Sequence, residues 1–221
     1  MPRTNDSSSS GRHYYPVLLD LEGKRCVVIG GGVVAERKVT ALLDCGARVV
    51  VIAPQVTQAI GDLARQGTIE LSSKPYTPGD LAGARMAIAA APADINAAAA
   101  DEAKRAGILI NVVDDPERCD FIVPAVARRG PVLIAVSSQG ASPALSRRLR
   151  EFIEEQVGPE YGELADLLGR LRPEVMTAGN EETRRRIWAA ILDSRVLELL
   201  REGRRDEAER EARRCISCAQ A

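Results

Sequence analysis

A glycine-rich turn near the start of the chain has the spacing of a dinucleotide-binding loop. Gly30, Gly32 and Ala35 match the pattern Gly-x-Gly-x-x-Ala directly after an apolar run at 26–29. Glycine permits a tight turn and a close approach of the backbone to a pyrophosphate, whose charge the amides of the next helix can bind. The alternative is a sharp turn without a ligand. A predicted strand before the turn and a predicted helix after it favour the binding loop.

The end of the next apolar run bears on which cofactor fits. A dinucleotide-binding domain usually carries an acidic residue there, which binds the ribose hydroxyls. Here the run ends in Ala53, Pro54 and Gln55, and no arginine suited to a 2′-phosphate follows directly. The ribose would therefore be met by backbone groups or by Gln55, and the local residues leave NAD and NADP both open.

Two aspartates follow a later predicted strand. Asp114 and Asp115 come just after the strand predicted at 108–111 and precede Pro116. Open α/β sheets bind ligands at the carboxyl ends of their strands, so either carboxylate could face a nicotinamide and act as a base. The alternative is a pair of ordinary turn aspartates before a proline. The pattern leaves both interpretations open.

A loop of small residues at 137–143 runs into a predicted helix. Amides and hydroxyls at such a place can bind carboxylate or phosphate groups. Arg129, Arg147 and Arg148 flank the loop. Together these residues could receive a polyanionic substrate, and the alternative is a set of exposed arginines without a ligand.

Histidine and cysteine usage argues against several other kinds of site. His13 is the only histidine and stands in a polar leader, which disfavours a histidine triad or a multi-histidine zinc site and leaves acid–base chemistry to other side chains. The cysteines are expected to be reduced. Only Cys215 and Cys218 form a motif, and a single CxxC is weak evidence for metal or redox chemistry.

The elements around these residues predict a Rossmann-like α/β fold. Apolar runs at 25–29, 48–52, 68–71, 86–90 and 108–111 alternate with helical segments at 34–45, 58–66 and 95–105, which indicates a doubly wound parallel sheet. Strand-like runs at 121–124 and 132–136 without a helix between them indicate a separate small sheet element. A helix that begins at Ser142 and Pro143 should extend to about 157, and charged helices follow from 160.

Length and charge limit the classes of function. The 221 residues can hold one fair-sized domain and a smaller appendage. Thirty Lys and Arg nearly balance thirty-one Asp and Glu, so the chain lacks the basic field, and also the stacking aromatics, of a nucleic-acid-binding protein. Without a long apolar run or a signal sequence, we expect a cytoplasmic protein that does not bind a membrane.

Several motifs, in order along the chain, resemble the precorrin-2 dehydrogenase and sirohydrochlorin ferrochelatase family. The resemblance runs from about residue 14 to 155. It rests on Tyr15-Pro16-Val17 with Leu21, Val28 to Lys38, Asn111 to Asp114, Phe121 to Pro124, Arg129-Gly130-Pro131, Ser137-Ser138 and Gly140 to Pro143. Gln139 stands where the family frequently has glycine, and the leader and the terminal CxxC are also departures from the family pattern.

The polar composition of residues 1–13 predicts a disordered leader, and the resemblance implies an NAD-binding Rossmann domain at 14–122. A homodimerisation segment at 123–157 and a helical region at 158–221 should follow. The implied cofactor contacts are Gly30, Gly31, Gly32, Val33, Val34, Pro54 and Gln55. Together with the loop argument above, the resemblance places substrate contacts at Arg129, Ser137, Ser138, Gly140 and Ser142.

The implied reaction is the NAD-dependent oxidation of precorrin-2 to sirohydrochlorin. The catalytic aspartate of the family matches Asp114, which would also be a transient ligand if the protein inserts ferrous ion into sirohydrochlorin. The methyltransferase domain of some members is not expected, because the chain ends at Ala221. Two alternatives stay open: a dehydrogenase with a separate chelatase, and an NAD-sensing protein without catalysis.

Overall fold

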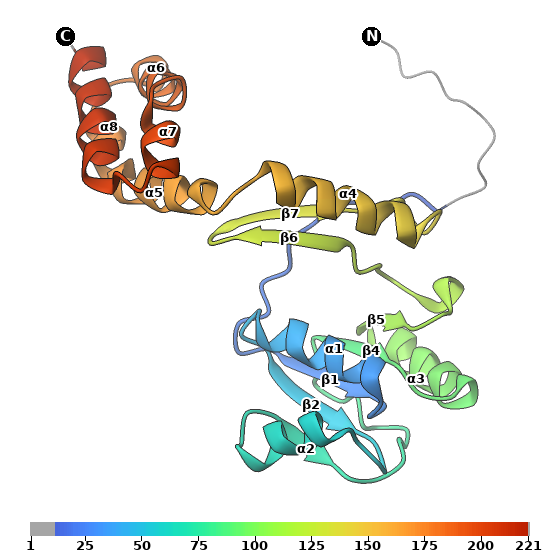
Figure 1. The fold of residues 1–221 in the computed structure, drawn as a ribbon. Coiled ribbons are helices and arrows are strands. Elements are labelled where there is room, and N and C mark those ends of the chain that lie inside the picture. Colours follow the sequence, from blue (N-terminus) through green and yellow to red (C-terminus); the bar gives the residue numbers. More distant parts are fainter. Residues whose placement is uncertain (1–11, 221) are drawn as a thin grey trace. The chain divides into compact units, whose positions relative to one another are not determined.

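The computed structural model describes residues 12–220, which divide into two compact units between Val123 and Pro124 (Figure 1). Residues 1–11 of the expected leader lie outside the described residues. The elements are β1 (Arg25–Ile29), α1 (Val33–Leu43), β2 (Arg48–Ile52), α2 (Gln58–Arg65), β3 (Glu70–Ser72), β4 (Met86–Ala89), α3 (Ala93–Ala106), β5 (Leu109–Val112), η1 (Pro116–Arg118), β6 (Ala125–Arg129), β7 (Val132–Val136), α4 (Pro143–Gln156), α5 (Glu160–Thr177), α6 (Glu181–Leu192), α7 (Val196–Arg201) and α8 (Arg205–Gln220).

A parallel sheet with the strand order β3-β2-β1-β4-β5 forms the centre of the first unit. The strands are short runs of Val, Ile and Ala because helices cover both faces of the sheet and leave no face for polar side chains. The chain winds outward from β1 in both directions. This confirms the predicted doubly wound Rossmann-like fold.

Successive residues of each strand feed two separate cores. Val27 and Ile29 pack in a core with α3, whereas Cys26 and Val28 pack in a core with α1 and α2, because side chains alternate across a strand. The buried face of α3 consists of Asn96 and three alanines, and these small side chains let the helix lie close to the sheet.

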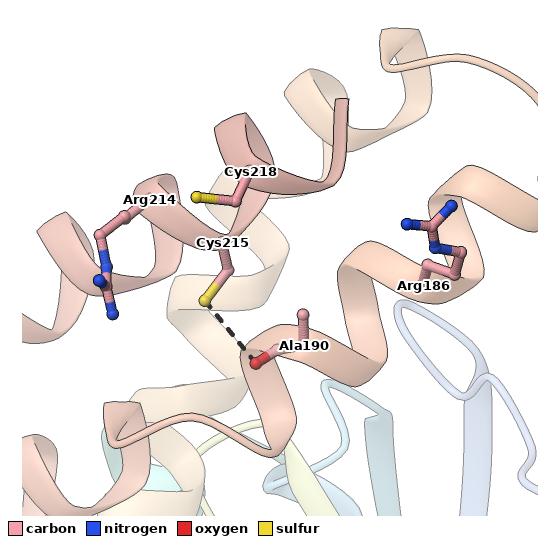
Figure 2. Close-up of a pocket in the computed structure, with 5 residues that line it drawn as sticks. All are labelled: Arg186, Ala190, Arg214, Cys215 and Cys218. Carbon is pink, nitrogen blue, oxygen red and sulfur yellow. Dashed lines mark hydrogen bonds between the residues drawn. The ribbon is translucent and has the colours of Figure 1, made fainter. Parts of the chain in front are cut away.

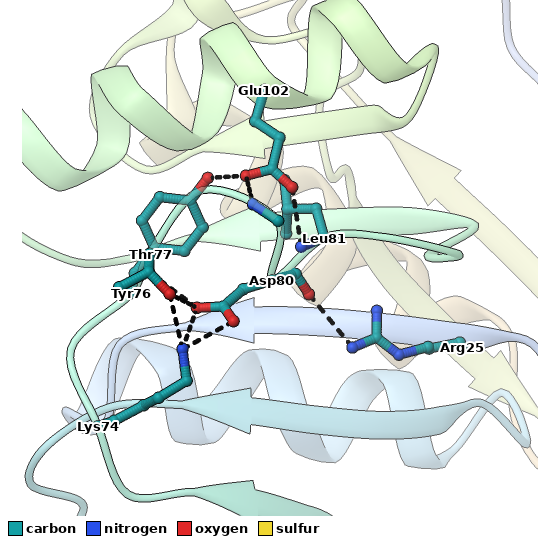
Figure 3. Close-up of polar contacts among 8 residues, drawn as sticks. Arg25, Lys74, Tyr76, Thr77, Asp80, Leu81 and Glu102 are labelled. Carbon is teal, nitrogen blue, oxygen red and sulfur yellow. Dashed lines mark hydrogen bonds and ion pairs between the residues drawn. The ribbon is translucent and has the colours of Figure 1, made fainter.

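The connection from β3 to β4 is an irregular segment at 73–85 that Glu102 of α3 holds in place (Figure 3). The carboxylate of Glu102 accepts hydrogen bonds from the amides of Gly79 (2.9 Å) and Leu81 (3.0 Å) and from the hydroxyl of Tyr76. Burial, together with this hydrogen bond, raises the pKa of Tyr76 well above its usual value. In a helical crossover, backbone carbonyls would accept hydrogen bonds from these amides. Here the carboxylate of Glu102 accepts them instead.

A second carboxylate, Asp80, closes the turn inside the same segment. It accepts hydrogen bonds from the Nζ of Lys74 (2.7 Å) and the amide of Thr77 (2.8 Å). Arg25 of β1 donates to the carbonyls of Asp80 (3.2 Å) and Ala82 (3.0 Å), which fixes the segment beside the sheet.

The second unit contains the hairpin β6–β7, the helix α4 and the helices α5 to α8. Antiparallel pairing joins β6 to β7, and Ser142 caps α4 by accepting a hydrogen bond from the amide of Leu145, as predicted. Leucine, isoleucine, valine and alanine side chains of α5 to α8 form one core. None of the described helices is long and apolar enough to span a bilayer.

The strand predicted at 121–124 is wrong, because β6 begins only at Ala125. Pro124 has no amide to donate to a strand partner. Residues 119–123 instead run beside β5, where the amide of Asp120 donates to Ile110 (2.9 Å) and the side-chain amide of Asn111 donates to Phe121 (3.0 Å).

We expect Glu102→Gln to destabilise the first unit. The amide group of Gln would turn a donor toward one of the three donors that Glu102 now satisfies, which costs about 1–3 kcal/mol of unfolding free energy. Urea denaturation measures the change. Asp101→Asn, on the exposed neighbour in α3, is the matched control and should leave stability unchanged; equal effects of the two variants would contradict the role of Glu102.

The contribution of Asp80 should depend on pH. Partial burial raises the pKa of this carboxyl, but the hydrogen bonds from Lys74 and Thr77 outweigh burial and leave the pKa below its usual value. A lowered folded pKa stabilises the protein above the unfolded pKa of about 3.9, and the stabilisation is lost as the pH falls through the folded value. Asp80→Asn should therefore destabilise at neutral pH and progressively less below about pH 4.

Thermal denaturation of both proteins across this pH range tests the prediction. The control is Asp62→Asn, which removes an exposed ion pair with Arg65 and should have little effect at any pH. A difference between wild type and Asp80→Asn that stays constant down to low pH would contradict the assignment.

Candidate active site

The glycine-rich turn lies where β1 and β4 end side by side, at the point where the strand order reverses. The amide of Gly30 donates to Ile52 of β2 (2.9 Å), and the amide of Ala90, just past β4, donates to Ile29 (2.8 Å). In doubly wound sheets this switch point is the place where dinucleotides bind. The fold therefore puts the predicted loop at the expected edge of the sheet.

Two of the glycines are needed for close backbone approaches. Gly30 has a φ of +114°, and a Cβ there would lie 2.8 Å from the carbonyl carbon of Ala90. A Cβ on Gly31 would collide with the carbonyl oxygen of Gln55 and lie 2.9 Å from the Cα of Val56. Larger residues at these positions would push the turn away from β4 or from the loop after β2.

The third glycine faces open space, and this geometry suits a dinucleotide. A Cβ on Gly32 would meet no atom within 4 Å, and Gly32 and Val33 are exposed. Gly32 is the N-cap of α1, and no side chain caps the first amides of this helix. The first turn, which includes Val34, therefore offers amides and a positive helix end to a pyrophosphate, so the residues present fit NAD or NADP.

The loop after β2 supports the glycine turn. Pro54 and Gln55 are exposed at its tip. Thr57 donates its amide to the carbonyl of Gly31 (2.9 Å), and its hydroxyl accepts from Ile60 (3.4 Å) to cap α2. Sequence reasoning missed Thr57, although a threonine before a helix is a known capping signal.

The structure distinguishes the two aspartates after β5. Asp115 forms an ion pair with Arg118 inside the turn. Asp114 is exposed, and its carboxylate has no hydrogen-bond or ion-pair partner among residues 12–220. Its φ is +60°, a left-handed conformation that side chains other than Asp and Asn rarely adopt. Such strain is common at functional sites, which favours Asp114 over Asp115 as the candidate base.

Two polar side chains, of the buried Cys119 and the exposed Asp120, hold the Asp114 turn to the sheet. The Sγ of Cys119 accepts from the amide of Val112 (3.1 Å), and Asp120 accepts from the amide of Ile110 (3.0 Å). Burial raises the pKa of Cys119, which keeps this thiol neutral. Cys119 and Asp120 are thus supporting residues that the sequence patterns did not single out.

Arg12 also contacts this turn, although the expected leader extended to residue 13. Its guanidinium donates to the carbonyls of Pro116 (3.0 Å), Glu117 (2.8 Å) and Cys119 (3.0 Å). The exposed His13 makes no such contact. Arg12 is therefore packed on the segment that follows Asp114.

The predicted substrate loop at 137–143 belongs to the second unit, and its own hydrogen bonds use several of its hydroxyls. The Oγ of Ser138 donates to the carbonyl of Ser142 (2.9 Å) and accepts from the amide of Ser142 (2.9 Å). Ser137 and Gly140 are exposed. Gln139 has a φ of +54°, which explains why glycine suits this position.

The structure gives Arg129 a role that the sequence did not suggest. Its guanidinium donates to the carbonyls of Glu154 (2.7 Å) and Val157 (2.7 Å) at the end of α4, and to that of Arg128 (2.9 Å). A cation at this position satisfies the free carbonyls and the negative end of the helix. A substrate contact at Arg129 stays a prediction, since much of its donor capacity is already used.

Three family models match consecutive parts of the chain. The model "Putative NAD(P)-binding" matches residues 17–125, "Sirohaem biosynthesis protein central" matches 129–156, and "Sirohaem synthase dimerisation region" matches 160–216. The chain belongs to the siroheme synthase family. Within this family the sheet and the glycine turn form the NAD(P)-binding part, in agreement with the geometry above.

Curated relatives carry the same family name. "Siroheme synthase" of Methylococcus capsulatus is 45% identical over 199 residues, and that of Azotobacter vinelandii is 39% identical over 199 residues. Each match covers 89% of this chain but only 42% and 43% of the two relatives. This siroheme synthase family member thus spans about two fifths of the length of these relatives.

A solved structure has the same fold. "SirC, precorrin-2 dehydrogenase" matches 91% of this chain and all of its own, with a TM-score of 0.72 and 24% sequence identity. The dimerisation model falls on residues 160–216 of this siroheme synthase family member, C-terminal to the dimerisation segment predicted at 123–157.

A pair of glycine substitutions should separate support of the turn from ligand contact. Gly31→Ala should destabilise the protein by about 1–3 kcal/mol, because its Cβ collides with backbone. Gly32→Ala should change stability by less than about 1 kcal/mol yet weaken NAD binding about tenfold or more, because its Cβ would occupy the open space in which the pyrophosphate is expected.

Thermal denaturation and calorimetric titration with NAD measure the two effects. Each variant is the control for the other. If Gly32→Ala bound NAD as tightly as the wild type, the ligand would not lie against this turn.

Proposed function

We propose that this chain oxidises precorrin-2 to sirohydrochlorin with NAD as the oxidant. The observation that carries the proposal is the exposed carboxylate of Asp114, which has no partner among the described residues 12–220 and stands in a left-handed turn at the same sheet edge as the glycine turn. Membership of the siroheme synthase family supports precorrin-2 as the substrate. The name of the structural neighbour points to the same reaction.

The residues of the first unit have distinct tasks in binding the cofactor. The amides from Gly30 to Val34 would bind the pyrophosphate, and Pro54 and Gln55 would lie beside the adenosine ribose. Bound NAD supplies a hydride acceptor. Because no acidic side chain follows β2 directly, Gln55 and backbone groups would bind the ribose hydroxyls.

Asp114 would accept the proton that leaves the substrate with the hydride. The oxidation removes one hydride and one proton from precorrin-2, so a base is needed close to the macrocycle. An exposed carboxylate without an ion-pair partner can take the proton at an oxygen atom and then release it to water. The hydrogen bonds of Cys119 and Asp120 hold the turn, so the carboxylate meets the substrate already oriented.

Binding of the carboxylate-rich substrate is assigned to the loop of the second unit. We propose that the exposed Ser137 and Gly140 contact the substrate directly. Ser138 and Ser142 would act mainly by shaping the loop, since their groups already bond to each other. Arg129 would then serve the end of α4 more than the substrate.

The family name also favours a second activity, the insertion of ferrous ion into sirohydrochlorin to give siroheme. Ferrous ion would be a substrate, and Asp114 could hold it briefly or accept the pyrrole protons. The match to a dimerisation model supports a homodimer. A cytoplasmic location fits this proposal.

Anaerobic incubation with enzymatically made precorrin-2 and NAD tests the proposal. We expect the absorption spectrum of sirohydrochlorin only when NAD is present, and a further change on addition of ferrous ion if the chain is also a chelatase. NAD binding without oxidation by the wild type would instead favour an NAD-sensing protein.

The variant Asp114→Asn tests the base. Asn tolerates the left-handed conformation, so folding and NAD binding should persist while kcat falls roughly 10²- to 10⁴-fold, the usual contribution of a general base. Asp115→Asn is the matched control and should keep most of the activity. Full activity of Asp114→Asn would contradict the assigned role.

A further inference from the structure

An open groove between α6 and α8 is lined by both cysteines of the CxxC motif. It has a volume of about 360 Å³ and is lined by Arg186, Ala190, Arg214, Cys215 and Cys218. Figure 2 shows the Sγ of Cys215 directed at Ala190 of α6, and the carbonyl of Ala190 accepts its weak hydrogen bond (3.7 Å). The groove lies within the second unit and shares no residue with the site described above.

The two thiols differ from the buried cysteines of the first unit. Cys218 is exposed and Cys215 is half-buried. Cys26 is buried in the sheet, where burial raises its pKa to about 11, and Cys119 is buried and bonded to backbone. Thiol reactions need an accessible thiolate, so the groove thiols are far better placed to react than Cys26 and Cys119.

The charges around the groove favour anions. Arg186 is exposed and has no ion-pair partner among residues 12–220. Glu211 holds Arg214 by two hydrogen bonds (3.0 and 2.7 Å). Glu211 is the main cause of the raised pKa of Arg214, so the charge of Arg214 is already balanced by a carboxylate. The cation of Arg186 therefore remains to attract a carboxylate, and it disfavours a bound metal ion.

We propose that Cys215 and Cys218 form a thiol–disulfide exchange site for a small disulfide that carries carboxylates. The volume of the groove is within the range of small-molecule sites. Arg186 would bind a carboxylate of the ligand, and Cys218, the more exposed thiol, would react first. This site is separate from the proposed oxidation of precorrin-2.

The exchange proceeds in two balanced steps. The thiolate of Cys218 attacks one sulfur of the small disulfide, whose S–S bond breaks, and the released thiolate takes up the proton that Cys218 lost. The thiolate of Cys215 then attacks the Sγ of Cys218, forms the protein disulfide and expels the second small thiol. Two electrons pass from the protein to the small disulfide.

Closing the protein disulfide would change the end of α8. Residues three apart on a helix have Cβ atoms about 5–6 Å apart, whereas a disulfide requires about 3.8 Å. The last turn of α8 must therefore tighten, and the Sγ of Cys215 must leave the carbonyl of Ala190. The thiol and disulfide forms should differ in how α8 packs on α6.

The full reduced chain, treated with glutathione disulfide, tests the site by intact mass and peptide mapping. We expect the wild type to lose two hydrogen atoms at Cys215 and Cys218. Cys215→Ser should stop at one glutathionyl group on Cys218, and Cys218→Ser should react much more slowly. Cys26 and Cys119 should stay unmodified, and far-ultraviolet circular dichroism verifies that each variant is folded.

A neutral probe, 2-hydroxyethyl disulfide, separates recognition from reactivity. Arg186→Gln should slow the reaction with glutathione disulfide roughly two- to fivefold and leave the neutral reaction unchanged, and Arg186→Lys should restore it. The proposal is overturned if Cys218 reacts no faster than Cys45, or if Arg186→Gln slows both probes equally. Tight binding of one zinc ion that Cys218→Ser abolishes, without exchange, would replace it with a metal site.

Discussion

The candidate site depends on the close approach of the backbones where β1 and β4 end. The hydrogen-bond ladder of the sheet continues one residue past its strands, from Gly30 to Ile52, from Ala90 to Ile29 and from Val113 to Ala89. These bonds hold the ends of four adjacent strands in register. The distance between the glycine turn and the turn after β5 is therefore set by the sheet and does not depend on the conformation of the loops beyond them.

Two irregular segments of the first unit are ordered by side chains rather than by a helix. Glu102 accepts hydrogen bonds from two amides of the segment at 73–85, and Asn111, Cys119 and Arg12 bind backbone groups of the segment after β5. Buried backbone groups need partners, and each of these side chains supplies one or more. The turn after β5 is thus held in place by groups that touch no proposed ligand, while Glu102 and Arg25 order the segment before β4 at the edge where β1 begins.

The sequence predicted the sheet and its helices well, because buried Val and Ile runs and the glycine turn are local signals. It placed a strand at 121–124 because an apolar run does not show that Asn111 holds this segment beside β5. Asp114 and Asp115 could not be told apart, since the left-handed φ and the partner Arg118 appear only in three dimensions. The helix end that Arg129 caps lies some 25 residues further along the chain, so no local pattern revealed it.

The small buried residues of α3 limit which substitutions this protein can accept during evolution. Ala99 and Ala103 are fully buried against the same core as Ile110 and Val112 of β5. At these two positions the helix contributes only methyl groups to this core, so a larger residue there would press against β5 and displace the turn that follows it. A substitution deep in this core therefore affects the candidate site through the sheet edge. Among homologous sequences, the residues on this face of α3 should vary less than those on its solvent-exposed face.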